Sequence, residues 1–541
     1  MRVNSKRLNP VRLKFFNVIF FPLIFCGLTL SLGSNAAEQK NSKSEILVDS
    51  AGSSFVGDGL TDNTKAIQAA IDSVYNAGGG VVEFSNGKFL TGPFVLRSNI
   101  TLQIDSSATI LATRNQKAYY YPNTDTTKPP ASLQNFIYAK NAVNITITGG
   151  GTIDGQGQPW WDSVNAAKAK GLSTLPLRPR LIELDNSKHI LITNITLKNA
   201  PMFHLCPQYS YDVNINHIKI LAPSNSPNTD GIDPAQCHHV RISYCTIDNG
   251  DDDIAVGASH NDPSWPGAAA NTDIIISHCT FLHGHGCSIG SYTSGGVDSM
   301  LVDSCTFNGT DNGFRIKSER GRGGDIRGIT YSNVTMTNVQ YPIYFSEYYP
   351  HIPSQTDPAQ TVNSTTPHYH DITIKNLTST GSPYAGVIVG LPEMFINNIH
   401  LQNVNISAGS GMQIRNASVD TVNTNVRVNS GPAFLMEVNS TVSGVTSVND
   451  AVVPAGFLLE QNYPNPFNPT TKLSFVIGHS SFVSLKVYDA LGREIETLVN
   501  EEKPAGIYRA EFDGSKYSSG IYFYRIHAGN FSAVRKMVLI K

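Results

Sequence analysis

The middle of the chain is a succession of short segments in which apolar and polar residues alternate, each followed by a turn rich in Gly, Asn or Asp. The segments "ISYCTIDNGDDDIAVG", "ISHCTFLHGHGCSIGS" and "VDSCTFNGTDNGFRIKS" share one plan: a strand, a polar turn and a second strand. Repeats built from strands and turns, with no helix between them, are typical of a solenoid. The pattern therefore predicts an all-β fold, a right-handed parallel β-helix, over residues 38–447.

The repeat can be followed through one apolar position of the second strand. The residues at this position are Ile232, Ile254, Ile289 and Ile316. With these residues in one column, Asp230 and Asp252 both lie two positions before the column and about 4.8 Å apart, one rung of the solenoid. Three cysteines also recur at one repeat position, and we expect them to form an inward ladder of small apolar side chains. They are Cys245, Cys279 and Cys305.

The two ends of the repeat region differ from its middle. Ile67, Ile71 and Val74 follow helical spacing and precede a run of three glycines, which predicts a helix that caps the N-terminal end of the solenoid. After a segment rich in Pro and Asn, alternating strands resume and continue to the last residue. Residues 448–541 therefore predict a separate small β-sandwich.

The first residues read as a targeting segment. Several basic residues precede the apolar run from Phe15 to Leu32, and small residues follow it. This order predicts a signal peptide over residues 1–37, cleaved near Ala36 or Ala37, with a membrane anchor as the alternative. Six cysteines remain after it and could pair outside the cell, but their pairing is not readable from the sequence.

Composition and charge exclude some classes of function. The formal net charge is −2 and charged residues make up 15% of the chain, so no basic footprint for nucleic acid is present. The cysteines form no C-x-x-C pair, which leaves a zinc site there without support. We expect a secreted or cell-surface monomer without metal or cofactor.

Polar and charged residues gather at one phase of successive repeats. They are Asp230; Asp251, Asp252 and Asp253; His285; and Arg315 with Lys317. Neighbouring carboxylates repel, so one of them can be held protonated at neutral pH beside an ionised partner. Cleavage of a glycosidic bond requires such a pair, one to donate a proton and one to activate water or attack. A calcium site and an ordinary acidic turn are the alternatives.

The two cations indicate the ligand. Arg315 and Lys317 are two apart on a strand and project from the same face, where they suit a carboxylate. A salt bridge to the aspartates is the alternative. Because their phase matches that of the acidic cluster, we favour a negatively charged sugar.

These motifs resemble a known family. "NTDGID", "GDDDI", "GHGCSIG" and "RIKS" occur in the order of the motifs of polygalacturonases in glycoside hydrolase family 28, and the resemblance spans residues 46–447. It implies hydrolysis of α-1,4-galacturonosyl linkages of pectin with inversion. By this resemblance Asp251 is the general acid, and Asp230 and Asp252 activate the water.

The same resemblance assigns the remaining site residues. His285 would support the acid and the bound sugar, while Arg315 and Lys317 would bind galacturonate carboxylates. Asn228, in "NTDGID", would contact substrate. The substrate-contacting tyrosine of the family aligns with Tyr348, although the adjacent Tyr349 is also possible. Asp253 departs from the family, which usually has Cys or Asn there, and we expect it to add a charge beside the acid pair.

The tail resembles a different family. "FLLEQNYPNPFNPTT", "SSGIYFYRIHAG" and the closing "KMVLIK" are similar to the C-terminal sorting domain of the type IX secretion system. The resemblance implies recognition by that export machinery. A carbohydrate-binding module is the alternative.

Other functions remain to be separated from this one. They are a related pectinolytic hydrolase for rhamnogalacturonan or xylogalacturonan, a calcium-dependent polysaccharide lyase and a non-catalytic glycan-binding solenoid. Exo action is slightly favoured over endo, because three segments could wall off one end of a cleft. These segments are residues 156–177, which include Trp160 and Trp161, residues 258–271 and residues 349–367.

Overall fold

The computed structural model describes most of the chain. The described residues are 47–48, 55–121, 132–258, 270–354, 357–444, 457–477, 480–504 and 506–541. The predicted signal peptide lies outside them. No helix within these ranges is long and apolar enough to cross a membrane.

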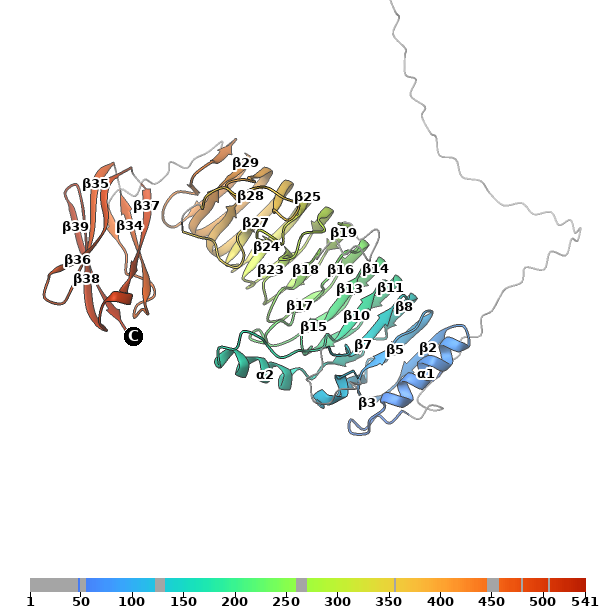
Figure 1. Cartoon of the computed structure of the whole chain (residues 1–541). Helices are drawn as coiled ribbons and strands as arrows, with labels where there is room; N and C mark the ends of the chain where they lie inside the picture. The colour runs from blue at the N-terminus through green and yellow to red at the C-terminus, as the bar shows by residue number, and fades with distance from the viewer. Residues whose placement is uncertain are drawn as a thin grey trace, which may run out of the picture. The chain divides into compact units, whose positions relative to one another are not determined.

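The central region is a parallel β-helix, as predicted (Figure 1). Strands of successive coils pair in parallel along three faces. The first face contains β1 (Leu47–Val48), β2 (Gly80–Phe84), β5 (Ile100–Ile104), β8 (Val143–Thr148), β11 (Lys188–Thr193), β14 (Tyr211–Asn216), β16 (His238–Ser243), β19 (Asn271–Ser277), β22 (Val297–Asp303), β29 (Ala417–Val422) and β32 (Ser440–Ser443). The second contains β3 (Gly87–Thr91), β6 (Ala108–Ala112), β9 (Thr152–Asp154), β12 (Thr196–Lys198), β15 (Lys219–Leu221), β17 (Thr246–Asp248), β20 (Thr280–Phe281), β23 (Thr306–Asn308) and β30 (Asn425–Val428).

The third face carries the charged motifs. It contains β4 (Phe94–Val95), β7 (Ile137–Lys140), β10 (Ile182–Asp185), β13 (Leu205–Gln208), β18 (Ile254–Val256), β21 (Cys287–Gly290), β24 (Asn312–Lys317), β26 (Tyr341–Ser346) and β31 (Phe434–Met436). Three long strands run over more than one face: β25 (Asp325–Thr337), β27 (His368–Val389) and β28 (Ile396–Arg415).

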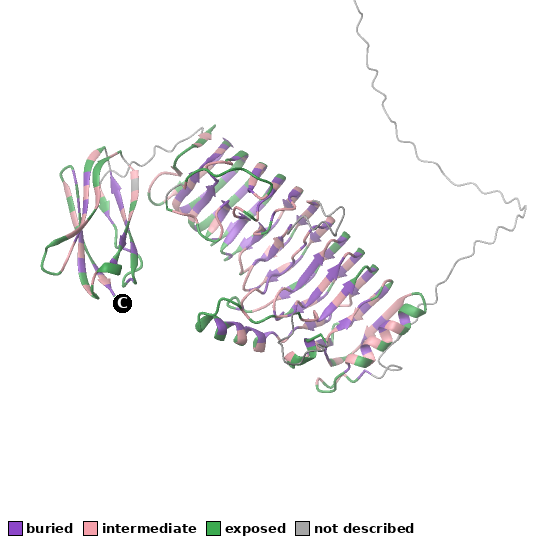
Figure 2. Cartoon of the chain, viewed as in Figure 1, coloured by how far each residue is buried: buried purple, intermediate pink, exposed green. Residues whose placement is uncertain are grey.

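Buried and less buried residues alternate along the strands (Figure 2), and the buried ones form one hydrophobic core. The predicted cysteine ladder is present, because Thr246, Thr280 and Thr306, which follow its three members, pair in register. All three cysteines are buried free thiols, as are Cys206, Cys237 and Cys287. They act as small apolar side chains of the core.

One prediction about the repeat is wrong. Ile232 pairs with Ile254, but Ile254 pairs with Cys287 and not with Ile289, which is opposite Val256. The marker column therefore slips by two residues between these coils. The alternation has a period of two, so a slip of two keeps every side chain on its face and is invisible in the hydrophobic pattern. In the true register, His285 and Asp252 occupy equivalent positions two residues before the column.

The capping helix is α1 (Thr64–Asn76), which buries Ile67, Ile71 and Val74 against the first coils and ends before Gly78. A second helix, α2 (Gln158–Ala169), was not predicted. Its Trp160 and Trp161 are buried, and Trp161 Nε1 donates a hydrogen bond to the Ala200 carbonyl at 3.1 Å. These tryptophans therefore pack inward.

The C-terminal region is the expected small β-sandwich, with antiparallel strands in both sheets. One sheet contains β33 (Leu458–Leu459), β34 (Thr470–Ile477) and β37 (Gly506–Asp513). The other contains β35 (Ser481–Tyr488), β36 (Glu494–Lys503), β38 (Gly520–Ala528) and β39 (Phe531–Leu539). Its core includes Phe475, Phe512 and Tyr524.

Candidate active site

A cleft of about 430 Å³ lies over the third face of the solenoid. Of the predicted site residues, only Tyr348 and Asp253 do not line it. Its lining includes Asn228, Asp230, Asp251, Asp252, His285, Arg315 and Lys317, together with Arg180, Phe203, Asp233, Tyr292 and Tyr349. Residues from at least four coils thus converge in one concave site.

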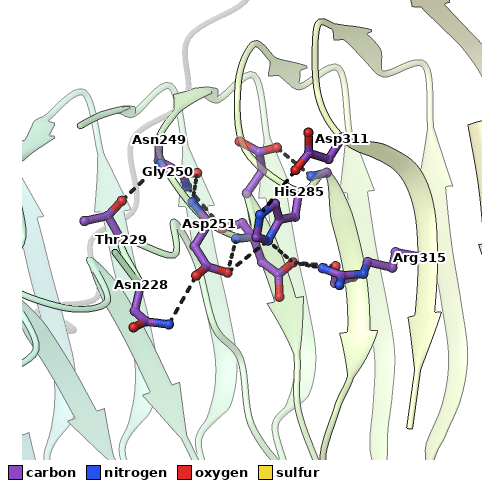
Figure 3. A network of polar contacts seen from close by, with 12 residues as sticks. Asn228, Thr229, Asn249, Gly250, Asp251, His285, Asp311 and Arg315 are labelled. Carbon is purple, nitrogen blue, oxygen red and sulfur yellow. Dashed lines mark hydrogen bonds and ion pairs between the residues drawn. The ribbon is translucent and has the colours of Figure 1, made fainter. Parts of the chain in front are cut away.

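Asp251 lies on the turn before β18 and is held by backbone contacts (Figure 3). Its N–H donates to Asn249 Oδ1 at 3.1 Å, and the Asn249 amide donates to the Asp252 carbonyl. The Asp252 N–H in turn donates to Asp251 Oδ1 at 2.9 Å. This closed turn leaves the Asp251 carboxylate at the cleft surface while Asp252 points deeper.

Asp252 is the charge centre of the site. Its carboxylate contacts Lys317 Nζ at 2.6 Å and Arg315 Nη1 at 3.1 Å, and it accepts a hydrogen bond from Ser288 Oγ at 2.8 Å. The side chains of Asp252 and Lys317 are only 3% and 7% exposed. Burial would raise the pKa of Asp252, but Lys317, Arg315 and His285 outweigh it and hold that pKa below its usual value. Asp252 is therefore ionised at neutral pH.

The carboxyls of Asp230 and Asp233 are shifted in the opposite direction to that of Asp252. Burial, followed by the charges of neighbouring aspartates, raises the pKa of both carboxyls well above the usual value. In each, Oδ1 has no hydrogen-bond partner among the described residues. One site thus combines a carboxylate that stays charged with carboxyls that retain a proton, the difference that acid–base chemistry requires.

His285 connects the acids of two coils (Figure 3). Its Nδ1 lies 3.1 Å from Asp251 Oδ1 and 3.7 Å from Asp252 Oδ1, and its Nε2 lies 3.4 Å from Asp311 Oδ2. Burial would lower the pKa of the imidazole, but Asp251 and Asp252 outweigh it and raise that pKa above the usual value. The ring can therefore hold a second proton beside Asp251.

Asn228 is oriented by an arginine that the sequence reasoning missed. Arg178 Nη2 donates to Asn228 Oδ1 at 2.7 Å, and Nη1 donates to the Pro227 carbonyl at 2.6 Å. With its oxygen occupied, the amide turns Nδ2 towards Asp251 Oδ2, at 3.2 Å. Arg178 thus fixes which end of the Asn228 amide faces the acid.

The structure does not bring Tyr348 to the cleft. Its hydroxyl donates to Asp357, and Arg320 lies over its ring at 5.7 Å. Tyr349 lines the cleft instead, with Lys317 Nζ 5.5 Å from its ring centre. The tyrosine in position to contact a ligand is therefore the second of the adjacent pair.

Asp253 also differs from the expectation. It is buried, its Oδ2 accepts a hydrogen bond from the Gly286 N–H at 3.0 Å, and burial raises its pKa well above the usual value. It therefore packs inside the wall as a protonated acid and adds no charge to the site.

Several residues of the site carried a readable signal that was not used. Arg178 and Arg180 stand two apart in "LRPRL", and Ser288 follows the histidine motif. Asp311 stands alone in a turn between strands, where nothing in the sequence connects it to His285. The arginine pair could have been flagged by the same argument that singled out Arg315 and Lys317.

Comparisons with known proteins identify the family of the solenoid. The family model "Glycosyl hydrolases family 28" matches residues 82–433. An endo-polygalacturonase of Pectobacterium parmentieri is 34% identical over 72% of this chain and 97% of its own length. The solved polygalacturonase of Erwinia carotovora is 31% identical, with a TM-score of 0.54 over 72% of this chain and 95% of that one. An exopolygalacturonase of Thermotoga maritima shares the fold, with a TM-score of 0.57 at 23% identity over 74% of this chain and 92% of that one.

A second model, "Secretion system C-terminal sorting domain", matches residues 461–541. It covers the β-sandwich from β34 onwards and indicates export by type IX secretion to the cell surface or the extracellular space. The first model matches most of the solenoid, and the Pectobacterium relative is matched over nearly its whole length. The chain therefore belongs to glycosyl hydrolase family 28 and carries a C-terminal sorting domain.

Proposed function

We propose that this protein is an exported polygalacturonase that hydrolyses α-1,4-galacturonosyl linkages of pectin or polygalacturonate with inversion of the anomeric carbon. The observation that carries the proposal is the pairing of Asp252 with Lys317 and Arg315 beside Asp251, in one cleft. Acid–base groups and cations suited to a carboxylate stand together there. The names of the relatives support the same substrate.

Asp251 is the proposed general acid. It lies at the cleft surface, where its proton can pass to the leaving glycosidic oxygen. His285 Nδ1, at 3.1 Å, can return a proton to Asp251 after the leaving group has departed. Asp311 faces the other ring nitrogen and would hold the imidazole in place.

Asp252 is the proposed base for the attacking water. Its lowered pKa keeps it ionised, so it can accept the proton that water loses as its oxygen bonds to the anomeric carbon. Asp230, with its raised pKa, would hold a proton and orient the same water from the cleft wall. The proton on Asp230 would thus stay in place while the ionised Asp252 accepts the proton from water.

Arg315 and Lys317 are the proposed carboxylate receptors. In the structure both already contact Asp252, the salt bridge that the sequence left open. A galacturonate carboxylate entering the cleft would share the cations with Asp252, and Tyr349 would offer an apolar ring against the sugar. Binding of an anionic sugar would therefore also adjust the basicity of Asp252.

Hydrolysis is favoured over the calcium-dependent lyase reaction by the charges of the site. Asp251, Asp252 and His285 lie close enough to hold a cation. Lys317 and Arg315, however, already place two positive charges against Asp252, and these would repel a divalent ion. No metal or cofactor is part of the proposal.

The slight preference for exo action stays a prediction. Most of the inserted segment of residues 258–271 lies outside the described residues, and the buried Trp160 and Trp161 do not line the described part of the cleft. Within the segment of residues 349–367, Asp357 Oδ2 contacts Arg320 Nη1 at 2.6 Å. The relatives include both endo and exo enzymes. A time course of product lengths distinguishes the two modes. Exo action releases monomer or dimer from the start, whereas endo action gives a ladder of oligomers.

Digestion of polygalacturonate in the presence of EDTA tests the main proposal. We expect new reducing ends without ultraviolet-absorbing unsaturated products, and NMR of fresh products should show the β-anomer. Asp251→Asn should lose the activity, whereas Asp212→Asn, at an exposed position of β14 on the first face, should keep it. Unsaturated products that disappear with EDTA would exclude hydrolysis. If the wild type and Asp251→Asn both bind polygalacturonate but neither cleaves it, the protein is a glycan-binding solenoid.

A further inference from the structure

A second cluster of ionisable side chains lies outside the cleft, on the first face of the solenoid. Asp325 begins β25 and pairs in register with His368, which begins β27, while His370 lies two residues further on. Each of the three side chains offers a potential ligand atom, and these atoms lie within 4.8 Å of one another. Neither the proposed reaction nor the core uses this cluster.

The three side chains converge on one oxygen. Asp325 Oδ1 lies 3.1 Å from His368 Nδ1 and 2.8 Å from His370 Nε2. The imidazoles project from the same face of one strand, and their rings stack with centres 4.2 Å apart. Ligands bound to one tetrahedral zinc ion at about 2.0–2.2 Å lie roughly 3.3 Å apart, so these separations need little change to receive a cation.

The groups around the cluster support metal binding. His370 Nδ1 contacts Asp371 Oδ2 at 2.7 Å, which leaves Nε2 to face Asp325; metal-ligating histidines usually bind a carboxylate in this way through the second nitrogen. Asp371 is itself held by the amide of Asn398. Arg327 contacts the other Asp325 oxygen, Oδ2, at 3.2 Å, and its charge is offset by Asp298 Oδ2 at 3.0 Å. Asp325 Oδ1 is left facing the two imidazoles.

We propose that Asp325, His368 and His370 form a binding site for a divalent cation of the zinc class. Two imidazole nitrogens and one carboxylate oxygen are a donor set that suits zinc rather than calcium or magnesium. The side chains are 45%, 31% and 16% exposed, so an ion can enter and water can complete its coordination. Because the ligands come from β25 and β27, the ion would join two coils where the segment of residues 357–367 returns to the solenoid.

Metal binding by the purified full chain, prepared without a histidine tag, tests this proposal. The protein is stripped with EDTA, dialysed and titrated with ZnCl₂ by calorimetry, and bound zinc is counted by elemental analysis. We expect about one equivalent to bind and the midpoint of thermal unfolding to rise with zinc concentration. His370→Gln should weaken zinc binding by more than about 100-fold, beyond the 10- to 100-fold typical of losing an outer partner.

Matched variants separate this site from others. His400→Gln alters a partly exposed histidine of the next coil, paired with Asp420, and should bind zinc as the wild type does. His285→Gln should also keep zinc binding, whereas His368→Gln should lose it and still hydrolyse polygalacturonate. The proposal is overturned if the wild type binds no zinc, if His370→Gln binds it equally well, or if His285→Gln is the variant that loses it. The zinc readout does not depend on activity, so it stands apart from the proposed function.

Discussion

Removing the ammonium of Lys317 tests the electrostatic core of the site. In Lys317→Met the side chain keeps its length and apolar stem, but Asp252 Oδ2 loses the contact at 2.6 Å. Asp252 retains Arg315 at 3.1 Å and the hydroxyl of Ser288 at 2.8 Å. The substitution therefore leaves a nearly buried carboxylate with one cation in place of two.

The expected magnitude follows from burial. Removing one partner of a buried ion pair lowers the free energy of unfolding by about 3–5 kcal/mol. Because Asp252 keeps Arg315 and Ser288, we expect a loss near the lower end, about 3 kcal/mol at pH 7, for Lys317→Met. Because the folded pKa of Asp252 is lowered, this stabilisation is present above the unfolded pKa of about 3.9 and is lost as pH falls through the folded pKa. The difference between variant and wild type should therefore shrink in acid.

Catalysis should respond in two ways. Loss of one charged hydrogen bond to substrate, about 1.5–3 kcal/mol, lowers kcat/KM for polygalacturonate about 10- to 150-fold. Asp252 also becomes easier to protonate, so the acidic limb of the kcat/KM profile should move up by about 1–2 pH units, at 1.36 kcal/mol per unit. The assay is initial-rate reducing-end release between pH 3 and pH 8 in steps of about half a unit.

The control is Lys375→Met, an exposed lysine of β27, which should match the wild type in both readouts. If kcat/KM falls in Lys317→Met while the acidic limb stays in place, Lys317 does not set the ionisation of Asp252. That result would falsify the electrostatic reasoning while leaving a substrate-binding role intact.

Three further predictions concern neighbouring groups. Asp230→Asn should abolish hydrolysis and raise the free energy of unfolding at pH 7 by about 0.5–2 kcal/mol, measured by urea denaturation. The reason is that the substitution removes a buried acid whose raised pKa opposes folding above about pH 3.9. Equal stability of variant and wild type at pH 7 would contradict this. Tyr349→Ala should raise KM by about 5-fold or more in steady-state kinetics, whereas Tyr348→Ala should leave it unchanged. If only Tyr348→Ala raises KM, Tyr348 is the tyrosine that contacts the substrate. Arg178→Met should lower kcat about 10-fold or more with KM little changed, because the Asn228 amide is no longer oriented; a rise in KM alone would assign Asn228 to binding only.

The fold was predictable from the sequence because each coil repeats the same local pattern. The alternation of inward and outward residues predicted the strands, and the helical spacing of Ile67, Ile71 and Val74 predicted the cap. The helix that contains Trp160 and Trp161 was missed because it lies in an insertion between strands. The register slip at Cys287 was missed because shifts by two residues leave the alternation unchanged.

The candidate site was predictable as a set of residues and not as a geometry. The motifs named Asp230, Asp251, Asp252 and His285 because charged and polar residues recur there at one phase of successive repeats. Whether Tyr348 or Tyr349 faces the cleft depends on the path of the chain after β26, which no periodic pattern determines.

By itself, the sequence determined that the chain is a solenoid with a sorting tail and that acids and cations share one strip of it. Only the tertiary structure decided which of them meet. Asp252 contacts Arg315 and Lys317 across 63 and 65 residues of chain, and the stacking of coils sets that contact. Whether a carboxyl keeps or loses its proton depends on burial and on such distant partners, which is why Asp252 is ionised while Asp230 retains a proton.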